Sequence, residues 1–247
     1  MTEGWYNSCS WLQDNSPDPF GDPDFYYELY PPKAEFEYPE TAYGVMSWWD
    51  YGYFIMQIGH RIPNANPGQA GAVQAGEFFI SQSESSANEL ADELGTKYVM
   101  IDYPMATPAK FYAMADWAGN DSSEFYDIYY LQTSSGWQGM YLFYPAYYNS
   151  AVVRLYNFDA KAAVSTQPMV IAYQEQEIEG ETFRIITNGP NPPTFPSYED
   201  AQAYVAAQTS GNYRIVGTDP FTSIVPLEEL DSYQLVYPLE GTTNTTT

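Results

Sequence analysis

The feature that most constrains this chain is residues 47–53, where two adjacent tryptophans stand directly before a carboxylate. The indoles of Trp48 and Trp49 are large apolar plates, each with one N–H donor and no acceptor. The carboxylate of Asp50 therefore has few local partners, and Gly52 permits a tight turn or a close backbone approach. Two interpretations follow. The segment forms the rim of a small recognition pocket that carries its own acceptor, or it ends a buried strand or helix where Asp50 caps backbone amides.

A pocket of this kind has the hydrogen-bonding groups that an aliphatic hydroxyl needs. A hydroxyl carries one O–H donor and two lone pairs. Asp50 can accept from the O–H, and the N–H groups of Trp48 and Trp49 can donate to the oxygen. A guest without the hydroxyl would leave these groups unpaired, and a fully buried site of this type rejects such a guest by roughly 10⁴-fold. The apolar ring faces can also accept the methyl group of a threonine.

Residues 48–52 spell Trp-Trp-Asp-Tyr-Gly, which resembles the motif that marks the catalytic subunit of oligosaccharyltransferase, most closely the archaeal AglB type. The flanking segments add to the resemblance. Residues 11–19 are similar to the segment that leads from the last membrane helix into the soluble domain. Residues 42–47 and 59–67 are similar to the runs before and after the pentapeptide. The resemblance extends over residues 11–159 and identifies the chain as the C-terminal globular domain of such a subunit.

The resemblance implies a role in binding the acceptor. In this family the soluble domain binds the Ser or Thr at position +2 of an Asn-X-Ser/Thr sequence. The implied hydroxyl ligands are Trp48, Trp49 and Asp50, and Tyr51 and Gly52 shape the pocket. The whole enzyme transfers an oligosaccharide from a dolichol-phosphate carrier to the asparagine, at the extracytoplasmic face of the cell membrane. Its catalytic carboxylates and its divalent cation, Mg²⁺ or Mn²⁺, belong to a membrane portion, so we expect no catalytic residue, metal ligand, cofactor or independent activity in this chain.

A second informative segment is the helix expected over residues 108–118. Thr107 and Pro108 make a favourable helix start, with threonine as the N-cap and proline in the first turn. Lys110 and Met114 are four residues apart and therefore share one helix face. Lysine is scarce in this chain, so a lysine beside apolar residues has two interpretations. Its stem covers apolar surface, or it belongs to the pocket, which the family resemblance favours.

The resemblance extends to this helix through a second family motif, Asp-x-x-Lys-x-x-x-Met/Ile, which lines the same pocket. Lys110 and Met114 keep the Lys-x-x-x-Met spacing, whereas Asp102 is too far upstream and Met105 stands where the lysine would be. The chain thus resembles a variant of the motif with an insertion, and this leaves the role of Asp102 open. The implied roles are that Lys110 donates to the guest hydroxyl or pairs with Asp50, and that Met114 packs on the threonine methyl.

The composition narrows the range of partners. The 247 residues include 32 acidic and 8 basic ones, a formal net charge of −24. Such a surface repels nucleic acid and anionic membranes as direct ligands. Cys9 is the only cysteine, which excludes an internal disulfide. His60 is the only histidine, so the sequence supports neither a histidine-rich metal site nor a Ser-His-Asp hydrolase. The sequence contains no run of 18 or more apolar residues, which is the length that a membrane-spanning helix needs.

The pattern of elements predicts an α+β fold. We expect a mixed, mainly helical central core over residues 1–165, with strands embedded around the Trp-Trp-Asp-Tyr-Gly segment. A small β-rich part over residues 166–240 packs on this core, and the threonine-rich residues 241–247 form a disordered tail. The expected elements are helices at 86–94, 108–118, 147–158 and 197–209, strands at 97–102, 126–132, 140–144, 213–217 and 233–237, and a hairpin that turns near Glu179-Gly180.

Two other functions stay open at this point. The tryptophans can stack on sugar faces in a carbohydrate-binding module of a cell-surface protein, or the chain can be a structural cell-surface protein. A carbohydrate-binding module binds free glycans, whereas the acceptor domain binds an Asn-X-Thr peptide weakly and does not bind sugar. In a structural protein, substitution of Asp50 leaves the function of the parent protein unharmed.

Overall fold

The computed structural model of the chain describes residues 2–22, 24–25, 29, 31–32 and 35–237. The expected disordered tail, residues 241–247, lies outside the described residues. The helices are α1 (Glu3–Asn15), α2 (Gly52–Gln57), α3 (Ala72–Ile80), α4 (Glu84–Glu93), α5 (Pro108–Trp117), α6 (Pro145–Asn149), α7 (Ala151–Asn157) and α8 (Tyr198–Ala206), with 3-10 helices η2 (Trp49–Tyr51) and η3 (Ser122–Glu124). The strands are β1 (Gly44–Met46), β2 (Ile62–Pro63), β3 (Thr96–Val99), β4 (Tyr126–Thr133), β5 (Gly136–Phe143), β6 (Met169–Ile178), β7 (Glu181–Ile186) and β8 (Asn212–Val216).

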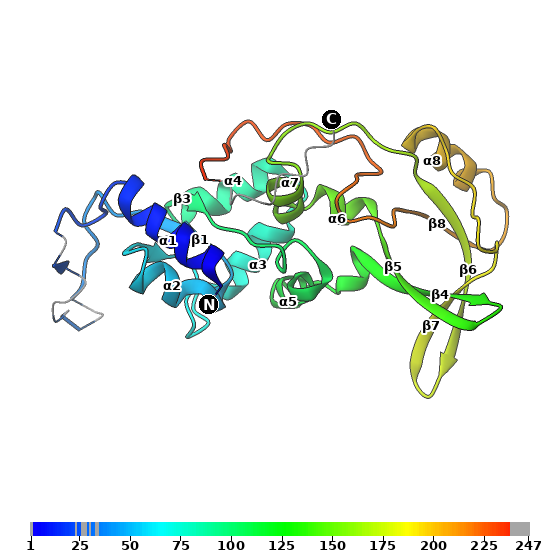
Figure 1. Cartoon of the computed structure of the whole chain (residues 1–247), viewed down its shortest axis with the longest axis horizontal. Helices are drawn as coiled ribbons and strands as arrows, with labels where there is room; N and C mark the ends of the chain where they lie inside the picture. The colour runs from blue at the N-terminus through cyan, green and yellow to red at the C-terminus, as the bar shows by residue number, and fades with distance from the viewer. Residues whose placement is uncertain (1, 23, 26–28, 30, 33–34, 238–247) are drawn as a thin grey trace.

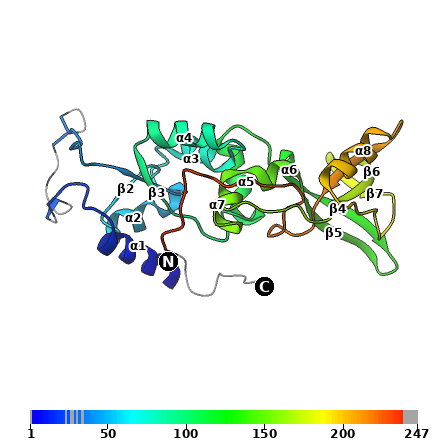
Figure 2. The same cartoon turned by 90° about the horizontal axis from the view of Figure 1, so that it is seen from above.

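The molecule is elongated, with most helices toward one end and a large sheet at the other (Figure 1). Helices α1 to α7 and the short strands β1 to β3 fill the first end and the middle, whereas β4 to β8 and α8 form the second end. The view from above shows the same division (Figure 2). Most helices therefore lie apart from the large sheet, which confirms the predicted α+β class. No helix of the described residues is long and apolar enough to cross a membrane.

A three-stranded parallel sheet lies next to the Trp-Trp-Asp-Tyr-Gly segment. Its order is β2-β1-β3, and the central strand β1 is buried along its whole length. Strand β3, at Thr96–Val99, is mostly half-buried and is shorter than the buried strand expected at 97–102. The sheet gives β1 and β3 the same direction, so their carboxyl ends lie at one edge.

The two chains stay paired beyond the carboxyl ends of these strands. The N–H of Met100 donates to the carbonyl oxygen of Met46 at 2.9 Å, and Ser47 Oγ donates to the carbonyl oxygen of Met100 at 2.8 Å. Residues 48–52 and Asp102 therefore leave the same edge of the sheet side by side. In parallel sheets this edge is where ligand-binding residues gather.

Helices α3 and α5 pack closely, and this contact sets the position of α5. A Cβ atom on Gly76 of α3 would lie 2.7 Å from the carbonyl oxygen of Met114 in α5, so only glycine permits the approach. Phe78 on α3 and Phe111 on α5 have no exposed surface. The helix expected over residues 108–118 is thus present and is held against the core.

A five-stranded sheet forms the other end of the molecule, in the order β5-β4-β7-β6-β8. Strands β4 and β7 are parallel, and the other neighbours are antiparallel. The predicted turn at Glu179-Gly180 is present, with positive φ at both residues, 54° and 86°. Strands β4 and β5 precede residue 165 and the other three follow it, so the sheet combines strands from both sides of the expected boundary. The division into residues 1–165 and 166–240 stays a prediction.

Two expected elements differ in the structure. The helix expected over residues 147–158 is divided into α6 and α7, because Ser150 between them adopts an extended conformation with φ −65° and ψ 142°. The segment 233–237, expected as a strand, forms no strand in the described structure. Its tyrosines pack individually on the helices, and the segment does not pair with a strand. The alternation of aromatic residues in the sequence does not distinguish these two arrangements.

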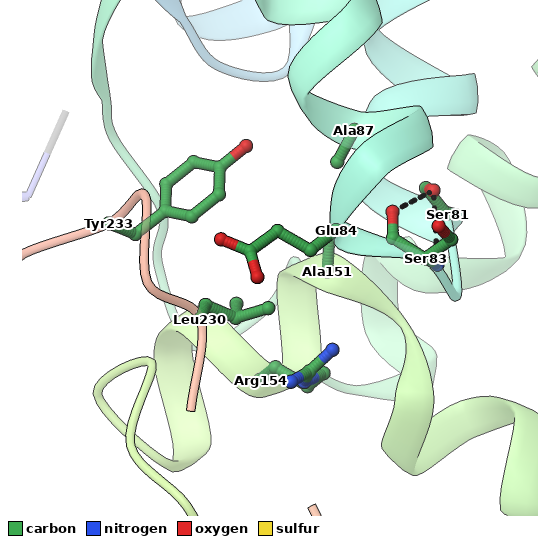
Figure 3. A pocket seen from close by; sticks show the side chains of 8 residues that line it. All are labelled: Ser81, Ser83, Glu84, Ala87, Ala151, Arg154, Leu230 and Tyr233. Atoms are coloured by element: carbon green, nitrogen blue, oxygen red, sulfur yellow. Dashed lines mark hydrogen bonds between the residues drawn. The ribbon is translucent and has the colours of Figure 1, made fainter. Parts of the chain in front are cut away.

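The C-terminal segment lies over the helical region. Tyr237 stacks on Trp11 with ring centroids 5.1 Å apart, and Tyr233 lies against Phe78. Near Tyr233 this segment and helices α4 and α7 border a cavity of about 10 Å³, room for about one water molecule. Figure 3 shows the side chains that line it: Ser81, Ser83, Glu84, Ala87, Ala151, Arg154, Leu230 and Tyr233. None of the predicted site residues is among them.

Candidate functional site

The Trp-Trp-Asp-Tyr-Gly segment folds into the short helix η2 and the start of α2. Trp48 is the N-cap of η2, without a side-chain hydrogen bond to the helix. Helix α2 begins at Gly52, where a Cβ atom would lie 2.8 Å from the carbonyl oxygen of Ala65. The carboxylate of Asp50 accepts from a side chain of another helix and caps no backbone amide among the described residues. The capping interpretation of Asp50 is therefore wrong.

Asp50 pairs with Lys110, which α5 supplies. The Lys110 ammonium donates to Asp50 Oδ2 and also to Tyr51 Oη, the latter at 2.8 Å. Its Nζ lies 3.9 Å from the centroid of the Tyr51 ring, within the range of a cation–π interaction. The side chains of Lys110 and Asp50 are 25% and 35% exposed. The structure thus brings together the acid and the amine that the sequence suggested for one pocket.

Asp102 joins this group through Tyr51. Tyr51 Oη donates to Asp102 Oδ2, and the same oxygen accepts from Trp5 Nε1 at 2.9 Å. The other carboxylate oxygen of Asp102 accepts from the backbone N–H of Met105 at 3.2 Å. Tyr51 therefore bridges Asp102 and Lys110, despite the extra residues between them in the sequence.

Trp5, in the first turn of α1, completes the group. Its ring stacks on that of Tyr51, with centroids 3.9 Å apart and an interplanar angle of 17°. Trp5 is only 7% exposed, and its hydrogen bond to Asp102 is partly buried. The sequence analysis missed this residue, because Trp5 and Asp102 are 97 positions apart and leave no local signal.

Two buried polar atoms of η2 have no hydrogen-bond partner among the described residues: Trp49 Nε1 and Asp50 Oδ1. Such atoms are uncommon, because each costs about 1–3 kcal/mol of folding free energy. Lys110 adds a third unused group. Its ammonium has three donors, and the described residues engage two of them, one on Asp50 and one on Tyr51. The site therefore holds one unused acceptor and two unused donors.

Trp48 and Met114 lie below the surface. Trp48 is 3% exposed, and its ring centroid is 6.3 Å from that of Trp49. Met114 has no exposed surface and lies one turn after Lys110 in α5. Both side chains belong to the main hydrophobic core. They therefore pack next to the polar residues of the site instead of standing at its mouth.

Burial and the neighbouring carboxylates favour the protonated form of Tyr51. Burial raises the pKa of Tyr51, and the carboxylates of Asp102 and Asp50 raise it further. The phenol thus stays protonated at neutral pH. Its single proton goes to Asp102, so its oxygen is free to accept from Lys110.

The C-terminal end of α1 is held by Arg61, which is 3% exposed. Its Nε donates to Ser16 Oγ at 2.8 Å, and Nη2 donates to the carbonyl oxygens of Gln13 at 3.0 Å and Ser16 at 2.6 Å. Its Nη1 donates to the carbonyl oxygens of Gly59 at 3.3 Å and His60 at 2.8 Å. A cation at this end also complements the helix dipole. These bonds fix the helix that carries the stacked tryptophan, and the sequence analysis did not anticipate them.

The described residues contain no group of three or more His, Cys, Asp or Glu that could hold a metal ion. Histidine, cysteine and carboxylate side chains are the commonest side-chain ligands of divalent metals in proteins. The residues present therefore do not fit the divalent cation that the family resemblance implies, and we assign no chemical step in this chain to a metal.

A groove of about 340 Å³ lies beside α5, at Pro108, Tyr112, Ser122, Ser123, Tyr126, Asp127, Ile128 and Tyr141. None of the predicted site residues lines it. The candidate site is therefore defined by its unpaired polar atoms and not by this groove.

Comparison with known proteins places a family match over the first part of the site. Residues 2–106 match the family described as the AglB core domain. AglB of Haloferax volcanii, a dolichyl-monophosphooligosaccharide–protein glycotransferase, is 35% identical over 256 residues, which covers 94% of this chain and 24% of the relative. Dolichyl-phosphooligosaccharide–protein glycotransferase 3 of Archaeoglobus fulgidus is 40% identical over 146 residues, covering 53% and 17%. The chain thus spans a quarter or less of the length of these relatives.

Solved structures share the fold. The oligosaccharyltransferase AglB of Archaeoglobus fulgidus, in complex with an inhibitory peptide and a dolichol-phosphate, superposes with a TM-score of 0.56 at 32% identity, covering 72% of this chain and 24% of that one. A structure of the oligosaccharyltransferase from the same organism, tethered with an acceptor peptide containing the NVT sequon, gives 0.57 at 30%, with the same coverage. A structure in complex with Zn and sulfate gives 0.56 at 26%, covering 85% and 27%.

The sequence matches, the fold and the pentapeptide all point to one class of proteins, which are named as archaeal oligosaccharyltransferases. The chain belongs to the AglB family of archaeal oligosaccharyltransferases. The match to the family core, residues 2–106, includes Asp50 and Asp102 and ends before Lys110.

Proposed function

We propose that this chain is the acceptor-recognition part of an oligosaccharyltransferase that glycosylates the asparagine of Asn-X-Ser/Thr sequences. Its task is to bind the Ser or Thr at position +2 of the acceptor polypeptide. The oligosaccharide would come from a dolichol-phosphate-linked carrier. The relatives named as glycotransferases support this proposal, as do the related structures with an NVT acceptor peptide and with dolichol-phosphate.

The observation that carries the proposal is the unused hydrogen-bonding capacity around η2. Asp50 Oδ1 is an unused acceptor, and Trp49 Nε1 and one N–H of Lys110 are unused donors among the described residues. An aliphatic hydroxyl offers one donor and two acceptor lone pairs. A hydroxyl bound here would donate to Asp50 and accept from Trp49 and Lys110. Each unused group would then gain one partner.

The other predicted residues would shape the pocket. Trp48 and Met114, both buried in the main hydrophobic core, would pack against a threonine methyl, and Tyr51, Gly52 and Asp102 would hold the segment in place. The two unpaired atoms are buried in the described structure. A hydroxyl therefore reaches them only after a local rearrangement of the site.

The chemical step would take place outside this chain, which covers 24% of its Haloferax relative and offers no metal site among the described residues. We infer that the catalytic carboxylates, the divalent cation (Mg²⁺ or Mn²⁺) and the carrier site belong to a membrane portion. The chain then lies at the extracytoplasmic face of the cell membrane and is inactive alone. Its contribution is to orient the acceptor, which lowers the entropic part of the barrier. The chain has a net charge of −24 and repels nucleic acid, so we propose no nucleic acid partner.

The carbohydrate-binding alternative finds no support at this segment. Stacking on a sugar requires an exposed ring face. Trp48 is 3% exposed, and Trp49 is half-buried with its N–H shielded from solvent. We therefore advance no second function.

A pair of acceptor peptides tests the proposal. The full-length enzyme is assayed with peptides that differ only at position +2, Asn-X-Thr and Asn-X-Val, because valine has the shape of threonine without the hydroxyl. We expect the wild type to favour threonine by roughly 10⁴-fold in kcat/KM. Trp49→Phe and Asp50→Ala each remove one partner of the hydroxyl and should narrow this ratio, whereas Asp231→Ala, at an exposed carboxylate, should keep it. If both site variants keep the full ratio, the hydroxyl does not bind here.

A further inference from the structure

We propose that Trp5 is a positioning residue for acceptor recognition, which orients Tyr51 and Asp102 and through them directs the Lys110 ammonium toward the acceptor hydroxyl. This inference rests on the function proposed above. Trp5 lies on α1, far in sequence from the pentapeptide and from α5. It supplies none of the unused hydrogen-bonding groups, so its influence on the acceptor passes through its neighbours.

The direction of the hydrogen bonds gives the first step. Asp102 Oδ2 accepts from both Trp5 Nε1 and Tyr51 Oη. A tyrosine hydroxyl has only one proton. Since that proton is donated to Asp102, the oxygen of Tyr51 presents a lone pair to Lys110, which donates to it at 2.8 Å. The orientation of Tyr51 thus decides where one of the three ammonium protons of Lys110 points.

Stacking gives the second step. The Trp5 ring lies parallel to the Tyr51 ring at 3.9 Å, with an angle of 17° between the planes. The ammonium of Lys110 lies 3.9 Å from the centroid of the same Tyr51 ring. The Tyr51 ring therefore contacts both the Trp5 indole and the Lys110 ammonium. A substitution of Trp5 would change the orientation of the Tyr51 ring and with it the position of the ammonium.

Rigidity of α1 gives the third step. Thr2 caps the helix start by accepting from the backbone N–H of Trp5 at 3.4 Å. Cys9 and Leu12 are buried, and Arg61 bonds the carbonyl groups at the far end. Asp102 is also fixed, because its second oxygen accepts from a backbone N–H. Trp5 is thus held by a helix anchored at both ends, as a positioning residue must be.

Three variants of the full-length enzyme test this inference. Trp5→Phe keeps an aromatic ring against Tyr51 and removes the N–H that bonds Asp102, whereas Trp5→Ala removes both contacts. Trp11→Phe is the matched control, because Trp11 lies on the same helix, is half-buried and stacks on Tyr237 instead. Each variant is assayed with the Asn-X-Thr and Asn-X-Val peptides.

We expect Trp5→Phe to raise KM for the Asn-X-Thr peptide about tenfold, the usual effect of one lost hydrogen bond to a charged group. The value of kcat should change little, and Trp5→Ala should raise KM further. Transfer to the Asn-X-Val peptide should stay the same, because that peptide has no hydroxyl for Lys110 to meet. The preference for threonine therefore falls, which general loosening of the fold would not produce. Trp11→Phe should leave both peptides unaffected.

A second measurement, on the chain itself, does not depend on transfer. The ring current of Tyr51 shifts the NMR signals of the Lys110 ε-methylene group, because the ammonium beside it lies 3.9 Å from the ring centroid. The chain has four lysines, so the signals are few. Trp5→Phe and Trp5→Ala should move the Lys110 signals toward those of a free lysine, and Trp11→Phe should not.

The outcomes separate the two proposals. Unchanged KM and unchanged Lys110 signals in both Trp5 variants would overturn the positioning role. Asp50→Ala serves as the reference: if it abolishes transfer while the Trp5 variants are silent, only the inference about Trp5 fails. If Asp50→Ala leaves transfer intact, the proposed function fails, and the NMR signals alone then decide whether Trp5 orients Lys110.

Discussion

The two ends of the molecule each carry a close acid–base pair, and the pairs differ in what surrounds them. In the helical region Lys110 pairs with Asp50, and in the large sheet Arg184 pairs with Asp127. The exposures are comparable, since the two side chains of the sheet pair are each 21% exposed. Arg184 also donates to Glu175 at 3.2 Å, so it connects three neighbouring strands, β4, β7 and β6.

The difference lies in the hydrogen-bonding capacity that is left over. Asp127 uses its second oxygen to accept from the N–H of Ile128 at 2.7 Å, and no buried atom of this sheet group lacks a partner in the described structure. In the helical region, Trp49 Nε1 and Asp50 Oδ1 remain unpaired. An ion pair alone therefore does not mark a binding site. Unfilled donors and acceptors beside the pair distinguish a site from a cross-strand brace.

The largest expected effect separates the two acids. Asp50→Ala in the full-length enzyme should lower transfer to an Asn-X-Thr peptide by about 10³-fold or more, because the acceptor hydroxyl loses its only anionic partner. Trp48→Ala and Trp49→Ala should likewise abolish transfer while the fold survives. Asp127→Ala should keep transfer and lower the free energy of unfolding by about 1 kcal/mol, the upper range for partly exposed pairs. Near-normal glycosylation by two of the three site variants would remove the distinction between the regions.

The next effect compares the two cations. Lys110→Met keeps the apolar stem and removes the ammonium, so we expect kcat/KM for the Asn-X-Thr peptide to fall about 10–100-fold, as for one lost charge-assisted hydrogen bond. Arg184→Met should leave kcat/KM unchanged. Steady-state assays over a range of peptide concentrations measure both. An unchanged peptide KM in Lys110→Met would reassign Lys110 to covering apolar surface.

A smaller effect compares one glycine in each region. Gly76→Ala forces a Cβ atom against the Met114 carbonyl oxygen and should cost about 1–3 kcal/mol of unfolding free energy by overpacking. Gly180→Ala meets no atom within 4 Å and should cost about 1 kcal/mol through its positive φ alone. Urea denaturation measures both. Because Gly76 sets the position of α5, its variant should also reduce transfer, whereas the Gly180 variant should not.

The smallest effect concerns Cys9 on α1. Burial raises the pKa of this thiol from 9.0 to about 12. The folded state therefore holds the proton more tightly than the unfolded state, and this contribution to stability is complete below pH 9 and is lost as the pH rises toward 12. At pH 8 iodoacetamide should react slowly with the folded chain, and Asp50→Ala should leave that rate unchanged. Faster labelling in Asp50→Ala, measured by mass spectrometry, would show that the substitution loosens α1 as well as the pocket.

The sequence predicted the parts that depend on local signals. The α+β class, helix α5 with Lys110 on its first turns and the turn at Glu179-Gly180 follow from capping residues, periodicity and turn chemistry. The proximity of Asp50 and Lys110 came from the family resemblance and not from the pattern. Whether the acceptor hydroxyl binds there stays a prediction.

Contacts between distant segments were not predictable in this way. The role of Asp102 was left open because its spacing to Lys110 departs from the family motif. In the structure Asp102 lies beside Tyr51 because β1 and β3 are parallel neighbours, and no local sequence pattern specifies this pairing. Trp5 was missed because its partners lie on two other segments. The break at Ser150 was missed because the apolar period continues through it.

The five bonds of Arg61 have a consequence for how the enzyme responds to its surroundings. The Arg61 guanidinium donates to four carbonyl oxygens and one hydroxyl, all of them uncharged groups. Buried bonds of this kind are also shielded from dissolved ions. The bonds that hold α1 in place should therefore be less sensitive to salt than the partly exposed pair of Lys110 and Asp50 in the site. A rise in salt concentration would weaken recognition before it loosens the scaffold.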